Sequence, residues 1–329
     1  MKRYLFYIIT LITVITVGLG FYKLNNKSTK PTLRVKAINF DAENQNDANP
    51  FLTKILEENY NLKFVNKNED VLLNGCLSRE PITKNPKVIK IYYTSELYTG
   101  SVQDQLQTQD LVLGFDYIDQ PNYIRFPFSY HRHKERMRHD YDRKRGECNP
   151  SEKKYFACFL ASNDGEWLPT FDGARERAKL FHRLSLYKKV LSGGKLLNNI
   201  GERVSFEQEK TEDWLSQCKF TIAYENQYYP GYITEKAFQA WFAGSIPIYN
   251  ADRSVLEDIN SKAVIFGGDF STQDELVDYI KKVDNDDELY CSIWNQRILV
   301  NPEKDYEVLI DKVRKKINEI FETKFNKKI

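Results

Sequence analysis

A lysine stands at the start of an expected helix in residues 219–250, KFTIAYENQYYPGYITEKAFQAWFAGSIPIYN. An apolar strand pattern runs into Glu225, a Pro-Gly pair predicts a turn, and Thr234 can cap the helix that follows. Glu235 suits the positive end of that helix, whereas Lys236 carries the charge that this end disfavours. Helix N-termini bind phosphate and a lysine adds a positive charge, so a nucleotide-diphosphate site is one reading of this pattern. Taken alone, the pattern favours the other reading, an ordinary surface lysine.

The elements that must position these residues alternate along the chain. Before residue 150, apolar runs predict a helix at 50–60 and strands at 32–40, 62–65, 70–76, 87–93, 110–115 and 123–128. The second half predicts strands at 154–162, 219–226, 246–250 and 263–267, and helices at 174–190, 208–217, 233–243, 273–283 and 309–329. Strands separated by helices favour parallel sheets in an α/β architecture. Two units are expected, because 329 residues exceed what one hydrophobic core usually organises.

The run AYENQYYPGYITEKAFQAWFAGSIPIYN resembles the donor-binding signature of the α-1,3-fucosyltransferases, glycosyltransferase family 10, and is most similar to bacterial-type members. The likeness is clear over 155–285, where FACFLASN, an arginine-bearing helix and GGKLLNNIG also match, and it is loose over 88–128. The resemblance implies a GT-B-like α/β fold with two Rossmann-like domains facing a cleft. It also implies an inverting transfer of L-fucose from GDP-fucose to a hydroxyl of a glycan acceptor, with α-1,3 linkage to an N-acetylglucosamine-type sugar.

Carried over residue by residue, the resemblance implies a donor site and a base. The donor-binding residues would be Arg177, Glu225, Asn226, Tyr232, Glu235 and Lys236. Within that set, Arg177 and Lys236 would hold the diphosphate, with Arg175 as a competing neighbour, while Glu225 would shape the site. Glu96, which follows the strand KVIKIYY, would be the catalytic base. A cationic clamp needs no metal, so neither a metal nor another cofactor is expected.

Two departures from the family pattern leave other functions open. Asn250-Ala251 stands where members often have Trp-Gly, and Glu96 lies in an unusual Thr-Ser-Glu-Leu context. The alternatives are a different nucleotide-sugar donor and a non-catalytic sugar-binding relative. A metal-dependent GT-A enzyme could use Asp284-Asn285-Asp286, although that stretch favours a helix-to-loop cap, and a glycoside hydrolase could use Glu225 with a second carboxylate.

Residues 4–22 carry no charge and, at about 1.5 Å per residue, would span roughly the thickness of a bilayer. We therefore expect a transmembrane signal-anchor at 1–22 and a polar stem at 23–30, with a cleaved signal peptide as the alternative. An acceptor-side domain at 31–150, a GDP-fucose-binding domain at 151–300 and a basic helix at 301–329 would follow. The protein would be a single-pass membrane protein, facing the Golgi lumen if eukaryotic and lying on the cytoplasmic face of the inner membrane if bacterial.

Net charge and the spacing of cysteines and histidines limit the kinds of partner that we expect. The net charge of +2 gives no field that favours nucleic acid. Five scattered cysteines without a CxxC pair indicate neither a zinc site nor a disulfide framework, and three histidines within 131–139 lack zinc-ligand spacing. The expected partners are GDP-fucose, a glycan acceptor on a glycoprotein, glycolipid or lipopolysaccharide-type molecule, and the membrane.

Overall fold

The structure is a computed structural model that describes residues 30–39, 50–76, 80–94, 96, 102–127, 129, 147–165, 170–300 and 306–325. The predicted membrane span, most of the stem and the three histidines of 131–139 lie outside these ranges. No helix within the described ranges has the length and apolar character needed to cross a membrane.

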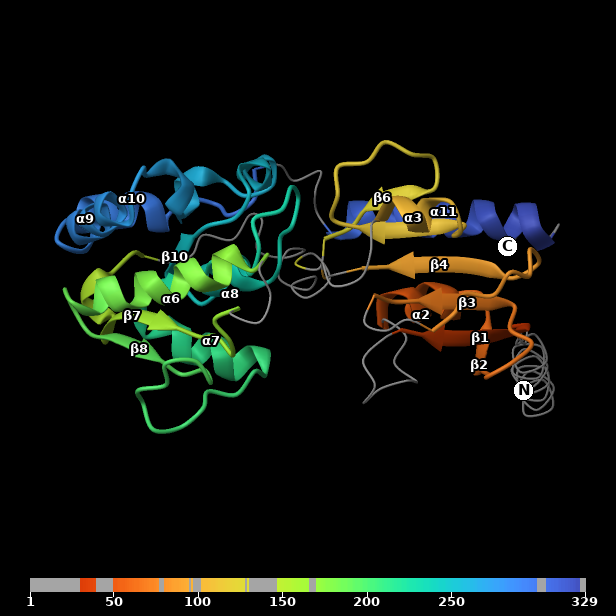
Figure 1. Cartoon of the computed structure of the whole chain (residues 1–329), viewed down its shortest axis with the longest axis horizontal. Helices are drawn as coiled ribbons and strands as arrows, with labels where there is room; N and C mark the ends of the chain where they lie inside the picture. Colours follow the sequence, from red (N-terminus) through yellow and green to blue (C-terminus); the bar gives the residue numbers. More distant parts are fainter. Residues whose placement is uncertain are drawn as a thin grey trace, which may run out of the picture.

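Two separate parallel sheets form the two lobes seen in Figure 1. The first sheet has the order β2-β1-β3-β4-β5-β6, and all its pairings are parallel. Its strands are β1 (Thr32–Ile38), β2 (Asn61–Phe64), β3 (Val71–Asn74), β4 (Ile89–Tyr93), β5 (Leu111–Gly114) and β6 (Tyr123–Arg125), and its helices are α2 (Pro50–Glu57) and α3 (Val102–Leu106). The buried strands β3 and β5 are apolar throughout or nearly so, as expected where helices cover both faces of a parallel sheet.

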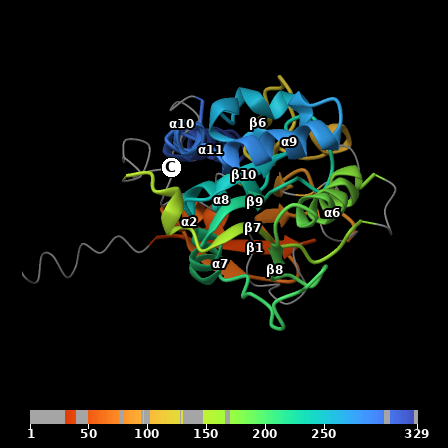
Figure 2. The same ribbon diagram turned by 90° about the vertical axis from the view of Figure 1, so that its left-hand side faces the viewer.

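The second sheet has the order β11-β10-β9-β7-β8 and is also parallel. Its strands are β7 (Tyr155–Phe159), β8 (Val190–Ser192), β9 (Cys218–Ile222), β10 (Ile246–Tyr249) and β11 (Ile265–Phe266). Its helices are α6 (Asp172–Ser185), α7 (Gln208–Ser216), α8 (Lys236–Phe242), α9 (Gln273–Asp284) and α10 (Asp287–Trp294), with short 3-10 helices at Pro150–Glu152, Arg253–Glu257, Ser261–Ala263 and Gly267–Asp269. Figure 2 looks onto this lobe, whose apolar side chains from α6, α9 and α10 share one core. The expected α/β fold with parallel sheets is confirmed.

The last described helix, α11 (Tyr306–Phe325), returns to the first sheet. Its apolar face shares a core with α2 and with β1, β3, β4 and β5. Polar contacts reinforce this position, because Arg314 pairs with Glu58 and Lys324 pairs with Asp110. The first unit is therefore covered by a helix that follows the whole second unit in sequence.

Two predictions about the fold that were made from the sequence are wrong. The predicted helix 174–190 ends at Ser185, and its last residue belongs instead to β8. Four of the cysteines form two disulfides, Cys148–Cys291 and Cys158–Cys218, although their spacing indicated none. Sequence separations of 143 and 60 residues explain the error, because only the packing of the second unit brings these pairs together. Cys76 is buried and free.

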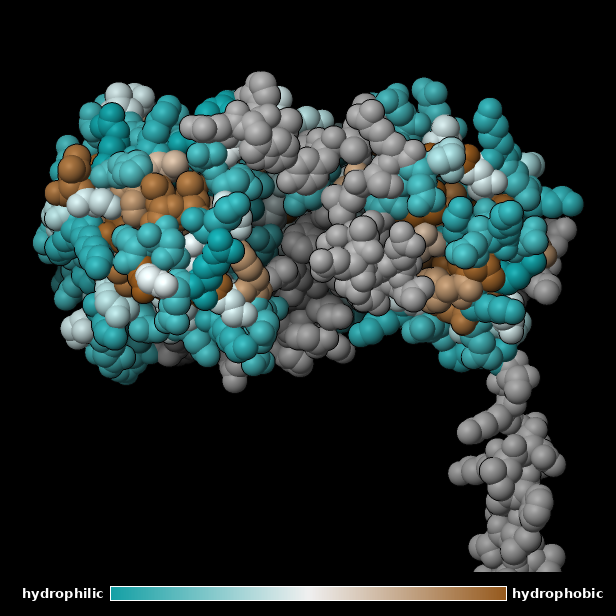
Figure 3. All heavy atoms as spheres, turned by 60° about the horizontal axis from the view of Figure 1, so that its bottom comes forward, coloured by the Kyte–Doolittle hydropathy of each residue, from teal (hydrophilic) through white to brown (hydrophobic). Residues whose placement is uncertain are grey.

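Exposed large hydrophobic side chains are spread over both lobes. They are Phe64, Tyr117, Leu186, Phe206, Tyr229, Val300 and Val308. The face shown in Figure 3 is mostly hydrophilic on both lobes, with hydrophobic patches among hydrophilic residues. Scattered exposed apolar residues are normal for a folded protein and need no partner to cover them.

Candidate active site

Glu225 organises the edge of the second sheet where β9 ends. Its side chain is fully buried, and both of its oxygens are occupied. Thr234 N donates to Oε1 at 2.8 Å and the Tyr249 hydroxyl donates to the same oxygen at 3.2 Å, while Thr234 Oγ1 donates to Oε2 at 2.6 Å. Lys236 Nζ lies 3.2 Å from Oε2. This carboxylate therefore fixes the residues at the start of α8, while its role in shaping a donor site stays a prediction.

Lys236 is the first residue of α8, so the predicted position of this lysine at a helix start is confirmed. Its Nζ donates to Thr234 Oγ1 at 2.7 Å, and its side chain is 21% exposed. Burial by itself lowers the pKa of Lys236, but the charges of Glu225 and Glu235 outweigh burial and hold that pKa above its usual range. Lys236 is thus a cation at neutral pH at the open edge of a buried network.

The predicted capping role of Thr234 is wrong. The N-cap of α8 is Glu235, and its side chain makes no capping hydrogen bond. The Thr234 hydroxyl donates instead to the buried Glu225 carboxylate. A buried charge that lacks hydrogen bonds is costlier than an uncapped helix end, which explains why Thr234 serves Glu225.

Arg177, on α6, is the second buried cation. Its Nη1 donates to Asn226 Oδ1 at 2.8 Å and its Nη2 donates to the Asn163 carbonyl at 2.9 Å, while the residue as a whole is 4% exposed. Burial lowers the pKa of Arg177, and the charge of Glu225 opposes that change. Its buried Nε has no hydrogen-bond partner among the described residues. Arg177 is therefore a cation that Asn226 and the Asn163 carbonyl hold in a fixed position.

One pocket brings together three of the six predicted donor residues, and Glu225, Asn226 and Tyr232 are not among the residues that line it. Arg177, Glu235 and Lys236 line it, next to the ends of β7 and β9, and Tyr224 and Phe206 contribute aromatic surface. Ligands of open α/β sheets bind at this edge. Arg175, the competing arginine, pairs instead with Asp172 and donates to the Gly165 carbonyl.

Glu96 follows β4 of the first unit and faces the second unit. The Tyr232 hydroxyl donates to Glu96 Oε2 at 2.8 Å across the gap between the two units. Burial raises the pKa of Glu96, and both the hydrogen bond from Tyr232 and the charge of Lys236 oppose that rise. A carboxylate with a raised pKa is suited to accept a proton near neutral pH. Tyr232, expected among the donor contacts, thus touches the candidate base instead, and its contact with a donor stays a prediction.

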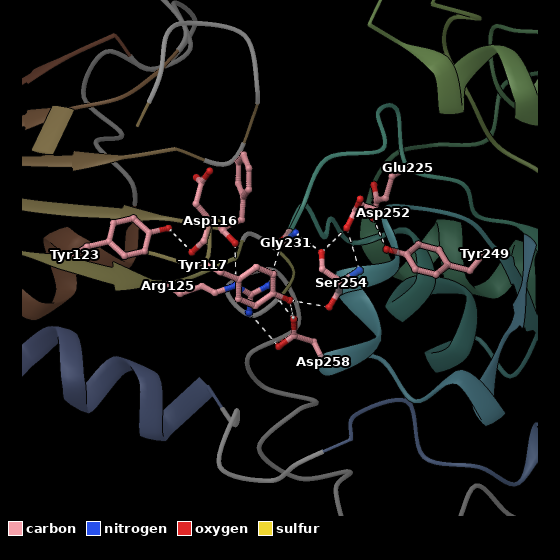
Figure 4. A network of polar contacts seen from close by, with 11 residues as sticks. Asp116, Tyr117, Tyr123, Arg125, Glu225, Gly231, Tyr249, Asp252, Ser254 and Asp258 are labelled. Atoms are coloured by element: carbon pink, nitrogen blue, oxygen red, sulfur yellow. Dashed lines mark hydrogen bonds and ion pairs between the residues drawn. The ribbon is translucent and has the colours of Figure 1, made fainter. Parts of the chain in front are cut away.

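Sequence reasoning missed the contacts that hold the two units together, and Figure 4 shows those made by Arg125 and Tyr117. Arg125 at the end of β6 forms an ion pair of 2.8 Å with Asp258 and donates to the Gly231 carbonyl at 3.1 Å. The Tyr117 hydroxyl donates to Asp258 Oδ2 at 3.1 Å, and the Tyr229 hydroxyl donates to Asp116 Oδ1 at 2.9 Å. A charge inside the apolar run YIRFPF was the available signal.

Gly231 allows the units to approach this closely. Its φ is 77°, and a Cβ at this position would lie 2.2 Å from the Phe115 carbonyl oxygen. No other residue combines that φ with the absence of a side chain. The Pro-Gly turn predicted from the sequence is therefore also the point where the backbones of the two units touch.

Two rival chemistries do not fit this geometry. All four contacts on the oxygens of Glu225 would have to break before it could act in glycoside hydrolysis. Asp284 is held by Lys188 and Lys219, and Asp286 caps α10 by accepting from Leu289 N, which confirms the helix-to-loop reading of that stretch. The described part of the chain contains no group of three or more His, Cys, Asp or Glu side chains that could hold a metal ion.

Comparison with known protein families agrees with this arrangement. Residues 150–319 match the model of "Glycosyltransferase family 10 (fucosyltransferase) C-term", which is more than half of the chain. Residues 35–131 match "Alpha-(1,3)-fucosyltransferase FucT N-terminal domain". The first match contains the donor-side pocket, and the second contains Glu96.

Individual relatives and solved structures point the same way. The chain is 29% identical to the alpha-(1,3)-fucosyltransferase FucT of Helicobacter pylori over 296 residues, covering 79% of this chain and 58% of the relative. It is 33% identical to the mouse 4-galactosyl-N-acetylglucosaminide 3-alpha-L-fucosyltransferase 9 over 150 residues, covering 45% of this chain and 38% of the relative. The chain thus spans less than two thirds of the length of either relative.

A crystal structure of an alpha1,3-fucosyltransferase has the same fold. Its TM-score is 0.68 and its sequence identity is 24%, with 90% of this chain and 92% of the other covered. The two parallel sheets, the donor-side signature and both family matches lead to one assignment. The chain belongs to glycosyltransferase family 10, the fucosyltransferase family.

Proposed function

We propose that this protein transfers L-fucose from GDP-fucose to a hydroxyl of a glycan acceptor, with inversion at the anomeric carbon. The observation that carries the proposal is that Glu96 of the first unit faces Lys236 of the second, and that Lys236 lines one pocket together with Arg177. Glycosyl transfer needs a base for the acceptor and a positive clamp for the leaving diphosphate. A solved alpha1,3-fucosyltransferase of this fold has been crystallised with GDP-fucose, which supports the choice of donor.

In the proposed reaction, Glu96 accepts the proton of the acceptor hydroxyl as that oxygen attacks the anomeric carbon of fucose. The bond between that carbon and the diphosphate oxygen breaks, and GDP leaves with the bonding electrons. Lys236 and Arg177 stabilise the negative charge that develops on the diphosphate, and Asn226 orients Arg177 through its 2.8 Å contact. Glu235 lines the same pocket and is placed to contact the donor. The cations do the work of a metal, so we propose that none is required.

For the acceptor, we propose an N-acetylglucosamine-type sugar and an α-1,3 linkage. The support comes from the names of relatives, since the mouse relative acts on 4-galactosyl-N-acetylglucosaminide. The carrier of that glycan would be a glycoprotein, a glycolipid or a lipopolysaccharide-type molecule. We also propose that the uncharged stretch 4–22 anchors the protein to a membrane. Detergent-dependent extraction of the full chain, compared with a chain starting at residue 30, tests the anchor.

Incubation with labelled GDP-fucose and a panel of glycan acceptors, in buffer with EDTA, tests the proposal. We expect label on acceptors that carry N-acetylglucosamine, and mass spectrometry of the product gives the linkage. Transfer from another nucleotide sugar alone would change the assigned donor. GDP binding without transfer to any acceptor would indicate a sugar-binding relative, and activity that returns only with Mn²⁺ would overturn the cationic clamp.

A further inference from the structure

We propose that Arg125 is a positioning residue for the reaction: by holding the Gly231 carbonyl and Asp258 of the second unit, it sets the Tyr232 hydroxyl against the Glu96 carboxylate. This inference rests on the proposed function of Glu96 as the base. The contacts of Arg125 described above are with residues that do not line the donor pocket, so its role would be to position other residues.

Arg125 is anchored in its own unit and reaches the other with its remaining nitrogens. Its Nε donates to the Phe115 carbonyl at 2.8 Å, within the first unit. Nη1 donates to Asp258 Oδ1 at 3.0 Å and Nη2 donates to the Gly231 carbonyl at 3.1 Å, both in the second unit. The guanidinium also lies 4.3 Å from the centre of the Tyr117 ring, and the Asp258 side chain is fully buried. A rigid planar fork that bonds three groups at once fixes distance and orientation together.

The segment that Arg125 holds leads directly to the candidate base. Gly231 is adjacent to Tyr232 in sequence, and Gly231 N donates to Ser254 Oγ at 3.0 Å, so both sides of the glycine are fixed. The Tyr232 ring lies edge-on to Phe115, with 5.1 Å between ring centroids. Phe115 is also the residue whose carbonyl accepts from Arg125. One residue of the first unit therefore supports both the arginine and the tyrosine.

The Glu96 side chain depends on this contact. Its backbone is fixed within its own unit, because the Thr94 hydroxyl donates to the Glu96 carbonyl at 2.6 Å. Tyr232 is the one hydrogen-bond partner of its carboxylate in the part of the chain that the structure describes. The charged groups that also face it are Lys236, Glu235 and Glu225, all from the second unit. A shift of the 229–232 turn would therefore move the partner of the base without touching the base itself.

Arg125→Lys is the variant that tests the proposal. A lysine keeps a cation for the buried Asp258 but cannot bond Phe115, Gly231 and Asp258 simultaneously. We expect kcat to fall roughly ten- to hundredfold, as for a small misplacement of a reacting group, with GDP affinity unchanged. Because the Tyr232 hydrogen bond lowers the pKa of Glu96, its loss should move the acidic limb of the pH–rate profile to higher pH.

A double-mutant cycle with Tyr232→Phe decides whether Arg125 acts through the tyrosine. If it does, adding Arg125→Lys to Tyr232→Phe should change kcat by less than about twofold, since the contact is already lost. Fully additive effects would overturn the proposal. If Arg125→Lys folds poorly, Arg125→Gln combined with Asp258→Asn removes both charges and avoids a stranded buried carboxylate. The same prediction holds for that pair.

Arg314→Gln is the matched control. Arg314 also joins distant parts of the chain, pairing with Glu58 on the first unit, but it has no contact with the 229–232 turn. We expect a small loss of stability and an unchanged pH–rate profile. A shift of the acidic limb in this control equal to that in Arg125→Lys would mean that the loss of any ion pair between distant segments produces the effect, and would overturn the proposal.

A titration without substrate separates this inference from the proposed function. Carboxyl ¹³C NMR, with the Glu96 signal assigned by its absence in Glu96→Gln, should show a higher Glu96 pKa in Arg125→Lys and in Tyr232→Phe. The double variant should show no further rise. If the wild-type chain fails to transfer fucose, the proposed function fails while this titration still decides the positioning role. An unchanged Glu96 titration in Arg125→Lys would overturn it.

Discussion

The two sheet edges that face one another are built differently. At the edge of the second sheet, the charged residues contact each other: Lys236 and Thr234 bind Glu225, and Arg177 binds Asn226. At the edge of the first sheet, Glu96 is a single carboxylate whose partner Tyr232 comes from the other unit. The donor-side residues are thus held within their own unit, whereas the Glu96 carboxylate, among the described residues, is held only by a hydrogen bond from the other unit. Donor binding and proton transfer should therefore respond to different mutations.

Replacing the base should have the largest effect on activity. This substitution, in the first unit, tests whether proton transfer can be lost without loss of donor binding. Glu96→Gln should lower transfer by roughly 10²–10⁴, because the amide cannot accept the acceptor's proton, while GDP affinity should stay near that of the wild type. Steady-state kinetics and calorimetry with GDP measure the two quantities. Glu80→Gln, on an exposed residue of the same unit, is the control. Near-normal turnover in Glu96→Gln would turn attention to Asp116, which has a buried oxygen without a partner among the described residues.

Replacing Lys236 or Arg177, both in the second unit, tests whether donor binding responds to mutations on its own side of the site. Lys236→Ala and Arg177→Ala should each weaken GDP binding about ten- to hundredfold, since a charge-assisted contact to phosphate contributes roughly 1.5–3 kcal/mol. Lys236→Ala also removes a cation from the buried Glu225, so binding should be measured well below the unfolding temperature. Arg175→Ala is the matched control on the same helix and should leave GDP affinity almost unchanged. Equal losses in all three variants would contradict the assigned clamp.

The pH dependence of transfer gives a smaller and graded effect. Burial raises the pKa of Glu96, and the base must be ionised, so activity should be lost as pH falls through that raised pKa. Below it, kcat/KM should fall about tenfold for each pH unit. The loss should begin at a higher pH than for an exposed glutamate. An acidic limb that persists unchanged in Glu96→Gln would assign it to another group.

The smallest effect on activity is expected at Asp284, whose sequence context resembles a metal-binding motif but which pairs with two lysines in the structure. Asp284→Asn should destabilise the protein by about 1–2 kcal/mol through its contacts with Lys188 and Lys219, and leave transfer unchanged at temperatures where it is folded. Burial would raise the pKa of Asp284, but both lysines hold it below its usual range. Its contribution to stability is therefore complete above the ordinary aspartate pKa and is lost as pH falls through the lowered value. Unfolding curves in urea at neutral and at acidic pH measure this difference.

Much of the second unit could be predicted from sequence because its site residues lie close together in the chain. Glu225, Tyr232 and Lys236 fall within one strand-turn-helix segment, and the same segment carries the family pattern. Hydrophobic periodicity also located most strands, since buried parallel strands are apolar runs. The misplaced end of α6 and the missed strand β8 are short-range errors, because three residues give too little periodicity to distinguish a strand from a helix end.

The contacts between the units could not be predicted in this way. Arg125 lies 133 residues from Asp258, and Tyr232 lies 136 residues from Glu96. No local pattern encodes a partner at that distance. The disulfides were missed for the same physical reason, because cysteine spacing along the chain does not report which strands and helices pack together.

The return of α11 to the first sheet affects the order in which the protein can fold during synthesis. The first sheet, at residues 32–125, leaves the ribosome before the second unit, but the helix that shares its core is made after the whole second unit. Until α11 has been synthesised, one apolar face of the first sheet is therefore incompletely covered. The nascent chain is most prone to aggregation during that interval. A chain stopped after residue 300 would leave that face uncovered permanently. Such a truncation would damage the unit that lies farthest away in sequence.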